Sequence, residues 1–218
     1  QAEGQRPQAR VRQLLVDRGY QEVVNFAFIE EAWEADFAAN ADPIRLANPI
    51  ASQMAVLRST LLGGLIANLV TNLRRKQSRV RLFETGRIFR RAAQGFPVAG
   101  FDQPWKLAGL AYGGALPEGW GSGARKVDFY DVKGDLEALL APASLRFEKL
   151  GHPALHPGRA ARVLRDGVDI GCIGELHPEW VQKYDLPLAP VVFEIDFAAA
   201  MATAVPAYAE VSKFPPVI

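Results

Sequence analysis

The sequence predicts an α+β fold in which a mostly antiparallel sheet is flanked by helices. The second half of the chain alternates short apolar segments with turns instead of repeating a strand–helix unit. Arg165-Asp166-Gly167 suits a hairpin, since Asp-Gly tolerates the positive φ angles of a two-residue turn. Between residues 60 and 75 the leucines recur at helical spacing. Strands joined by hairpins, with helices beside them, are typical of an antiparallel sheet with helices packed on it.

The first part of the chain is expected to alternate helices and strands. A helix is predicted over 7–18, with an apolar face formed by Val11, Leu14 and Leu15. The segment 22–28 is rich in Val and Phe, which favours a strand. The next elements are a short helix over 30–37, a strand over 44–47 and a helix over about 60–75, whose C-terminal cations suit the negative end of its dipole.

The second part is expected to be richer in strands. Strands over 80–91 and 105–112 enclose a loop that contains Gly and Pro, and the Gly-rich stretch 113–123 is predicted to be an exposed loop. An amphipathic helix follows over 128–140. The remaining elements are strands over 145–150, 160–164 and 168–176, a helix over 178–184 and a strand over 191–197.

Composition narrows the classes of protein. With 218 residues, 49% of them hydrophobic and 22% charged, the chain resembles an ordinary soluble globular domain. No apolar run approaches the ~20 residues of a membrane helix, so no membrane association is expected. Cys172 is the single cysteine, which excludes a disulfide framework and fits a cytoplasmic protein. A net charge of +1 means that nucleic-acid binding would need a local basic patch.

The sequence offers no convincing catalytic or metal site. His152 and His156 stand four residues apart, but a proline follows each and prevents the regular helix that would place both on one face. The sequences His156-Pro157-Gly158 and His177-Pro178 are better interpreted as turns. Cys172 lies in an apolar predicted strand, where a buried, inert thiol is expected. The Gly-rich stretch lacks the Gly-Lys-Ser/Thr sequence of a phosphate-binding loop. We therefore predict neither catalytic residues nor metal ligands.

A cluster of cations lies at the end of the helix predicted over 60–75 and in the strand after it. Its members are Arg74, Arg75, Lys76, Arg79 and Arg81. One interpretation is that they contact RNA phosphates, which would make binding steeply dependent on salt. The other is that they form a solvated helix end and strand face, as most charge runs do. The sequence favours the second interpretation, and we expect this basic cluster to contribute little to RNA affinity.

Several short blocks, spread over nearly the whole chain, occur in the same order in a known family. They are DRGYQEVV (17–24), NPI (48–50), LRSTLL (57–62), LFETGRIF (82–89), VDFYDVKG (127–134), HPG (156–158), IGELHP (173–178), FEID (193–196) and KFPPV (213–217). The first resembles the helix-into-strand start of motif 1 of class II aminoacyl-tRNA synthetases. Together the blocks resemble the class II synthetase-like domain of the β subunit of bacterial phenylalanyl-tRNA synthetase. This resemblance implies a class II aminoacyl-tRNA synthetase-like antiparallel sheet flanked by helices.

The departures from active class II enzymes fall mainly on the motifs that bind ATP. Motif 2 pairs an arginine that holds the α-phosphate with an acidic residue, but here Ala92 replaces the acid after Arg90. Motif 3 has glycines and an arginine that clamps the γ-phosphate, and the segment 194–200 has neither. Phe26 stands where motif 1 has proline. Because adenylate formation depends on such charge clamps, the resemblance implies a domain without catalysis of its own. Arg90 would then be a vestigial motif 2 arginine, and no residue of this chain would bind a cofactor.

The resemblance also implies an assembly. In this family the domain packs against a catalytic α subunit, and two αβ pairs form a heterotetramer that charges tRNA(Phe) in the cytoplasm. The whole enzyme uses ATP and Mg²⁺. Motif 1 is the dimerisation element of class II synthetases, so its match leads us to expect a partner interface here. The residues expected in it are Val11, Leu14, Leu15, Val23, Val24, Phe26 and Phe28.

The expected domain boundaries follow from the extent of the matching blocks. Residues 1–6 would be a linker remnant, 7–210 the class II synthetase-like core domain, and 211–218 the start of a linker to an absent anticodon-binding domain. Two alternatives stay open at this point. One is a stand-alone RNA-binding module that uses the basic cluster, which would bind tRNA tightly and salt-sensitively. The other is a degenerate class II ligase that retains activity, which would exchange pyrophosphate into ATP.

Overall fold

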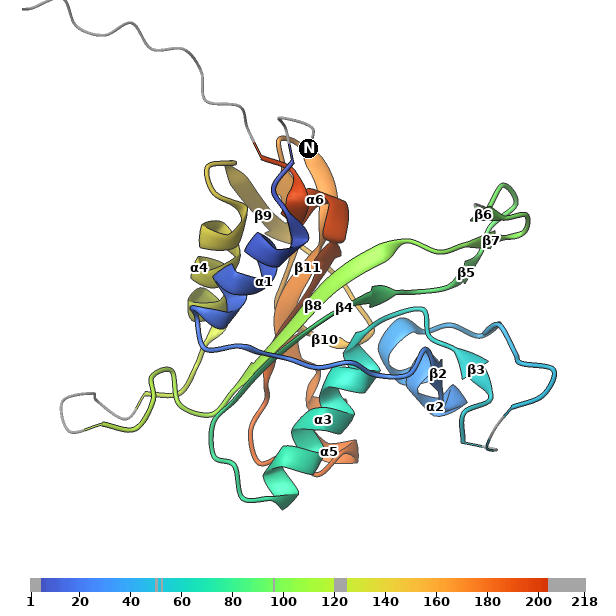
Figure 1. Ribbon diagram of the computed structural model, residues 1–218. Coiled ribbons are helices and arrows are strands. Elements are labelled where there is room, and N and C mark those ends of the chain that lie inside the picture. The colour runs from blue at the N-terminus through green and yellow to red at the C-terminus, as the bar shows by residue number, and fades with distance from the viewer. Residues whose placement is uncertain (1–4, 50, 52, 96, 120–124, 204–218) are drawn as a thin grey trace, which may run out of the picture.

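One seven-stranded sheet forms the centre of the fold (Figure 1). The computed structural model describes residues 5–203 except 50, 52, 96 and 120–124. In spatial order the strands are β1 (Gln21–Glu22), β4 (Val80–Arg87), β8 (Trp105–Tyr112), β12 (Val191–Asp196), β11 (Val168–Leu176), β10 (Leu155–Arg165) and β9 (Leu145–Lys149). Every neighbouring pair is antiparallel except β1 and β4, which are parallel. The predicted α+β fold with a mostly antiparallel sheet is confirmed.

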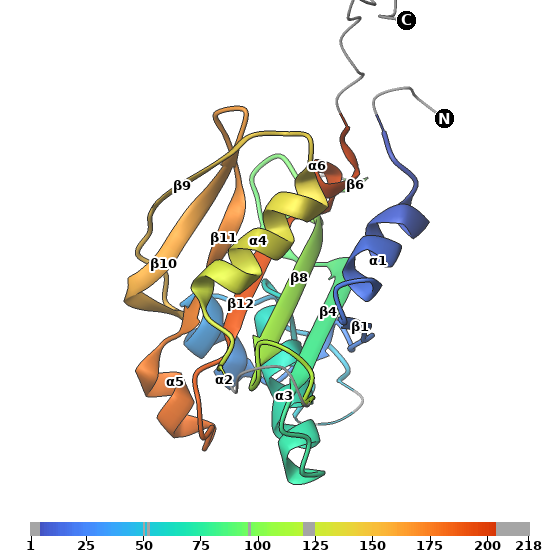
Figure 2. The same cartoon turned by 90° about the vertical axis from the view of Figure 1, so that its left-hand side faces the viewer.

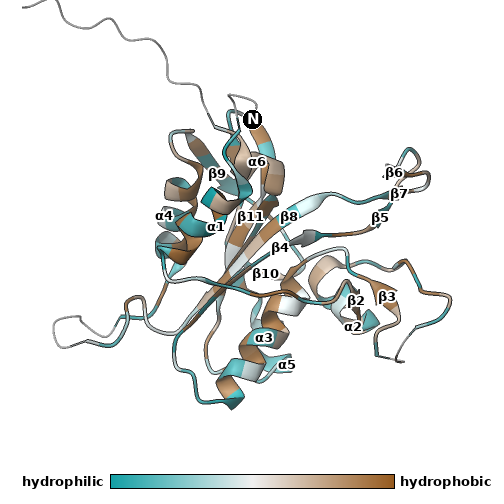
Figure 3. Cartoon of the chain, viewed as in Figure 1, coloured by the Kyte–Doolittle hydropathy of each residue, from teal (hydrophilic) through white to brown (hydrophobic). Residues whose placement is uncertain are grey.

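Helices cover both faces of this sheet (Figure 1, Figure 2). One face carries α1 (Gln8–Val16), α4 (Phe129–Leu140) and α6 (Phe197–Met201). The other face carries α3 (Leu62–Arg74), α5 (Pro178–Lys183), the short α2 (Glu31–Trp33) and the π-helix η1 (Glu34–Ala38). Hydrophobic residues gather in the central strands and in the helices beside them (Figure 3). Among the described residues, none of the helices is both long and apolar enough to span a bilayer.

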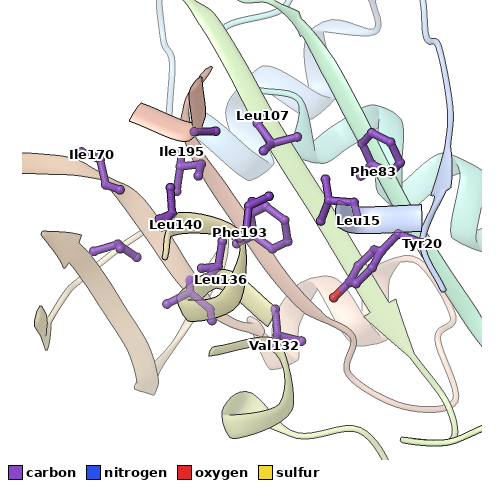
Figure 4. Packing of buried hydrophobic residues seen from close by; sticks show 14 of the residues in the cluster. Leu15, Tyr20, Phe83, Leu107, Val132, Leu136, Leu140, Ile170, Phe193 and Ile195 are labelled. Atoms are coloured by element: carbon purple, nitrogen blue, oxygen red, sulfur yellow. The ribbon is translucent and has the colours of Figure 1, made fainter. Parts of the chain in front are cut away.

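The central strands are apolar on both sides, as expected for a sheet covered by helices on each face. On β12, Phe193 and Ile195 join the core cluster under α1, α4 and α6, where Leu107 and Phe83 also lie (Figure 4). Val192, which directly precedes Phe193, packs into the second cluster, under α3 and α5. Successive strand residues thus supply two separate cores, one on each side of the sheet.

Most of the predicted elements are confirmed. β8 and β11 have the predicted bounds, and α3 lies within the predicted helix. The hairpin between β10 and β11 turns at Asp166 (φ 52°) and Gly167 (φ 81°), as the Asp-Gly sequence predicts. The helix α4 begins after Asp128, whose carboxylate accepts hydrogen bonds from the backbone amides of Tyr130 and Asp131 in a capping box.

The strand predicted over 22–28 is wrong as a continuous element. Its first residue pairs with the sheet in β1, and its last lies in β2 (Phe28–Ile29), which pairs with β3 (Val56–Leu57) in a separate ribbon. Between them, Asn25 directs its side chain to Glu84 instead of continuing the ladder. The strand predicted over 44–47 is reduced to a single bridge between Arg45 and Val56.

The strand predicted over 80–91 is divided in two. After β4 the amide of Phe89 donates to the carbonyl of Arg58 at 2.8 Å, so the chain leaves the main sheet. It continues as β5 (Arg90–Arg91), which forms a small sheet with β7 (Phe101–Asp102) and β6 (Pro97–Val98). In the predicted Gly-rich loop, 113–119 form no helix and only an isolated bridge from Gly114 to Lys126. Residues 120–124 lie outside the described part of the chain.

The fold begins earlier than predicted, within the segment expected to be a linker. The guanidinium of Arg6 donates to the carbonyls of Leu139 at 2.6 Å and Ala141 at 2.8 Å. Its amide donates to the carbonyl of Met201 at 2.8 Å. Arg6 therefore belongs to the core domain, because it ties the start of the chain to α4 and α6. The boundary predicted at 210 and the segment 211–218 lie outside the described residues.

Replacing Gly134 by alanine is expected to raise stability. Gly134 is exposed in the middle of α4, and a Cβ added there meets no atom within 4 Å. Alanine is favoured over glycine in a helix interior by about 0.5–1 kcal/mol. The free energy of unfolding, measured by urea titration, should increase by that amount in Gly134→Ala. A decrease would contradict the surroundings described for this residue.

Candidate functional site

The segment that resembles the end of motif 1 displays two large apolar side chains. Val24 is 90% exposed and Phe26 is 70% exposed, whereas Val23 packs against the core under α3. Asn25 points inward, to Glu84. The alternation arises because successive residues of an extended chain point to opposite sides. We call Val24 and Phe26 the exposed strip.

An apolar hollow of about 210 Å³ lies beside the exposed strip. Its apolar walls include Phe26, Phe28, Trp33 and Met54, and Arg58 contributes to its polar part. Exposed apolar groups gathered in one place mark sites of interaction with other molecules. A partner could therefore bind the exposed side chains of the strip and insert an apolar side chain of its own into the hollow.

The partner interface predicted from the sequence is wrong for Val11 and Leu15. Both residues belong to α1, and their side chains are fully buried in the chain's own core, between α1 and the sheet (Leu15 in Figure 4). Leu14, Val23 and Phe28 are partly buried. The apolar face of α1 therefore covers an intrachain surface, and the exposed strip is the most accessible part of the predicted set.

Arg90 lines a second, more polar pocket of about 560 Å³. Ser59, Thr60, His152 and Glu194 also line this pocket. The carboxylate of Glu194 accepts hydrogen bonds from Thr60 Oγ1 at 2.9 Å and from the backbone amide of Leu61, at the start of α3, at 2.7 Å. Burial raises the pKa of Glu194.

The residues of this polar pocket do not fit a magnesium-bound nucleotide. The Arg90 guanidinium lies 3.4 Å from the carbonyl of Ser59, and the neighbouring Arg91 is paired with Asp42 at 2.9 Å. The buried carboxylate of Glu194 lines the same pocket and would repel a phosphate. In the described part of the chain, no three His, Cys, Asp or Glu side chains are grouped as metal ligands. No step of adenylate chemistry can therefore be assigned to these residues.

The cysteine and the histidines have structural roles. Cys172 is buried, as predicted from the sequence, and burial, followed by the charge of Glu194, raises the pKa of its thiol to about 12. The Nδ1 atom of each histidine accepts a hydrogen bond from the backbone amide two residues later in the chain. The pairs are Ala154 to His152 at 3.2 Å, Gly158 to His156 at 3.0 Å and Glu179 to His177 at 3.2 Å. His177 is the N-cap of α5, whereas His156 lies within β10, so the turn predicted at His156-Pro157-Gly158 is wrong.

Part of the acid sensitivity of the chain is expected to come from His152. Burial, followed by the charge of Arg90, lowers the pKa of this imidazole from its ordinary 6.5. As the pH falls through 6.5, the unfolded chain gains a proton that the folded chain accepts only at lower pH, so stability is lost on the acid side. His152→Asn keeps an acceptor for the Ala154 amide but cannot titrate. Its free energy of unfolding, from urea titrations, should fall less between about pH 7 and pH 5 than that of the wild type; an equal fall would contradict this.

The structure separates the predicted basic cluster into exposed and buried members. Arg74, Arg75 and Lys76 are exposed at the end of α3. Arg79 is partly buried and donates to the carbonyl of Gly114 at 3.2 Å. Arg81 is buried on β4, where its guanidinium forms an ion pair with Asp135 of α4 at 2.7 Å, donates to the carbonyl of Ala115 at 3.2 Å and lies 5.3 Å from the ring of Tyr20. Neither interpretation of the cluster fits Arg81, which is buried and whose charge is used inside the fold instead of in solvent or at RNA phosphates.

Sequence reasoning missed a buried polar network behind the exposed strip. Arg58 and Glu84 form an ion pair at 2.7 Å, and both side chains are buried. Asn25 donates to Glu84 at 2.7 Å from its side chain, and Asn68 of α3 donates to Asn25 at 2.8 Å. The blocks LRSTLL and LFETGRIF contain Arg58 and Glu84, but their spacing along the chain gives no sign that the two meet.

Comparison with solved structures supports the predicted fold. A pyrrolysyl-tRNA synthetase from Desulfitobacterium hafniense matches with a TM-score of 0.61, over 88% of this chain and 63% of its own. The two sequences are 15% identical, so this match establishes similarity of fold alone. It confirms the class II aminoacyl-tRNA synthetase-like arrangement expected from the sequence.

Comparison with known sequences identifies the family. The chain is 80% identical to the phenylalanine–tRNA ligase β subunit of Dechloromonas aromatica, 64% to that of Aromatoleum aromaticum and 57% to that of Cupriavidus pinatubonensis. These matches cover 95–100% of this chain but only 26–28% of the relatives, so the chain spans about a quarter of their length. The family model of the phenylalanyl-tRNA synthetase β chain CLM domain matches residues 1–197. The chain therefore belongs to the family of phenylalanyl-tRNA synthetase β chain CLM domains.

Proposed function

We propose that the chain is a non-catalytic domain of a phenylalanine–tRNA ligase β subunit that supports assembly with a catalytic α subunit. In this proposal the assembly contains two α and two β subunits in the cytoplasm, and charges tRNA(Phe) with phenylalanine. The whole enzyme uses ATP and Mg²⁺, and this chain binds neither of them. The single observation that carries the proposal is the exposed strip beside an apolar hollow.

The apolar character of this surface favours a protein partner. Burying one large apolar side chain stabilises by about 1.5–3 kcal/mol. Because Val24 and Phe26 are exposed in the free chain, this stabilisation would be gained only when a partner covers them. Phe26 is 70% exposed and projects beside the hollow, which can receive an apolar side chain of the partner in return. An interface of this kind suits a stable assembly, since permanent interfaces are richer in apolar contacts.

The polar pocket supports the non-catalytic part of the proposal. Its strongest cation for a phosphate would be Arg90, but the carboxylate of Glu194 lines the same pocket, and Arg91 is paired with Asp42. The exposed Arg74, Arg75 and Lys76 are too few to suggest a stand-alone RNA-binding module, and family membership favours neither that alternative nor a degenerate active ligase.

The test is assembly of the full-length β chain carrying Phe26→Asp with its α subunit. A charge at the centre of an apolar interface would be buried without a partner, so the affinity should fall by at least about a hundredfold. Sedimentation of the α–β mixture measures the loss of the complex. Tyr130→Asp is the matched control, because Tyr130 is a 76% exposed aromatic residue on α4, away from the strip. Equal assembly of the Phe26→Asp chain and the control would reject the surface.

A further inference from the structure

The exposed strip is attached to the rest of the fold through few contacts. At its start the amide of Val23 donates to the carbonyl of Phe83 at 2.9 Å, and at its end the amide of Arg58 donates to the carbonyl of Ala27 at 3.0 Å. Between these points the attachment is Asn25, whose amide donates to Glu84 Oε1 at 3.3 Å and whose side chain donates to Glu84 Oε2 at 2.7 Å. Asn25 therefore fixes the middle of the segment between Val24 and Phe26.

The side chain of Asn25 is bound at both ends of its amide group. Its Nδ2 donates to Glu84, and its Oδ1 accepts a hydrogen bond from Asn68 at 2.8 Å. Glu84 is in turn held by Arg58, which also donates from Nε to the carbonyl of Arg87 at 3.1 Å. A buried polar network in which each member has its partners allows one arrangement and resists others.

Two glycines leave the space that this network occupies. A Cβ on Gly64, in α3, would lie 2.9 Å from Asn25 Nδ2. A Cβ on Gly86, in β4, would lie 2.2 Å from an Nη atom of Arg58. Any larger residue at either position would displace a member of the network. Asn25, Arg58 and Gly64 also line the apolar hollow beside the strip, so the network supports both parts of the surface.

We infer that Asn25 is a positioning residue for docking of the α subunit: through Glu84 and Arg58 it holds the exposed strip and the hollow in the arrangement that a partner meets. This inference rests on the proposed function. With Asn25 directed inward, its two neighbours must point outward, because side chains alternate along an extended chain. A surface already ordered in the free chain loses less conformational entropy when it docks, which strengthens the complex without adding a contact.

The first test compares Asn25→Ala with wild type in the full-length β chain. Affinity for the α subunit, from titrations followed by sedimentation, should fall about tenfold, the factor expected when one or two side chains must be ordered on docking. Hydrogen exchange of the amides of Val24 and Phe26 should be faster in the free variant and should return to the wild-type rate in the complex. Asn72→Ala is the matched control, because among the described contacts the side chain of Asn72 donates only to the carbonyl of Asn68, within α3.

A second variant covers the case in which Asn25→Ala does not fold. Gly64→Ala crowds Asn25, while alanine suits the interior of α3, so the fold should persist and the affinity should fall in the same way. Lower thermal stability with unchanged affinity in both variants would overturn the inference and leave Asn25 a structural residue. If Phe26→Asp weakens assembly but these variants do not, only the positioning role fails. If Phe26→Asp also leaves assembly unchanged, the proposed docking surface fails, and the inference with it.

Discussion

Arg58→Met is expected to lower the free energy of unfolding by about 3–5 kcal/mol. Arg58 is the cationic partner of Glu84 at 2.7 Å, and both are buried between β4 and the loop before α3. Methionine fills much of the arginine's volume but leaves the carboxylate charged and without its cation. Removing one partner of a buried pair is strongly destabilising because the remaining charge stays out of water. A urea titration near neutral pH measures the change.

Two comparisons isolate the unpaired charge as the cause. Adding Glu84→Gln to Arg58→Met removes the charge while keeping an acceptor for Asn25, and should recover part of the lost stability. Arg146→Met is the exposed control, since Arg146 and Glu148 form a solvated pair at 3.1 Å and such pairs contribute about 0–1 kcal/mol. If Arg58→Met cost no more than Arg146→Met, the buried pair would not have the role described.

Gly171→Ala is expected to destabilise the sheet by roughly 2–6 kcal/mol. Gly171 lies on β11 opposite Ile195 of β12, with φ of 144°, a conformation that L side chains rarely adopt. A Cβ at this position would lie 2.1 Å from the carbonyl oxygen of Glu194, which belongs to the backbone and cannot rotate away. Backbone strain and overpacking therefore act together. The free energy of unfolding from urea titration, or failure to obtain folded protein, measures the effect.

The control for this prediction is a glycine without either constraint. Gly151 is exposed, and a Cβ added there meets no atom within 4 Å. Gly151→Ala should leave stability within about 0.5 kcal/mol of the wild type or raise it slightly. A Gly171→Ala chain as stable as this control would show that the two strands can separate locally to admit a methyl group.

How much of the fold could be predicted depended on whether local pattern and tertiary contacts agree. The leucines of α3 recur at helical spacing and β11 contains the apolar stretch 170–174, and both elements lie where the sequence places them. The segment 22–28 has the composition of a strand, but Asn25 is bound by Glu84, a residue 59 positions away. No local pattern contains that contact, so the predicted strand was too long.

The site was predictable to a similar extent. Val24 and Phe26 belonged to the predicted interface, and both are exposed. Val11 and Leu15 belonged to it as well, because an apolar helix face looks the same in sequence whether it meets its own sheet or a partner. Arg81 was assigned to the basic cluster for its charge, but its position on β4 places it beneath Asp135 of α4. Which side of a strand is covered depends on distant helices, and charge spacing does not encode it.

The carboxylate of Glu194 affects whether the polar pocket can bind small anions. The start of a helix, with its free amides, is a common binding place for phosphate, and here the amide of Leu61 is bound by the Glu194 carboxylate at 2.7 Å. An incoming anion would compete with a ligand that is covalently part of the protein and present at an effective concentration of at least millimolar order. The helix start is thus occupied by an internal competitor, and free phosphates or nucleotides at lower concentration would leave it undisturbed.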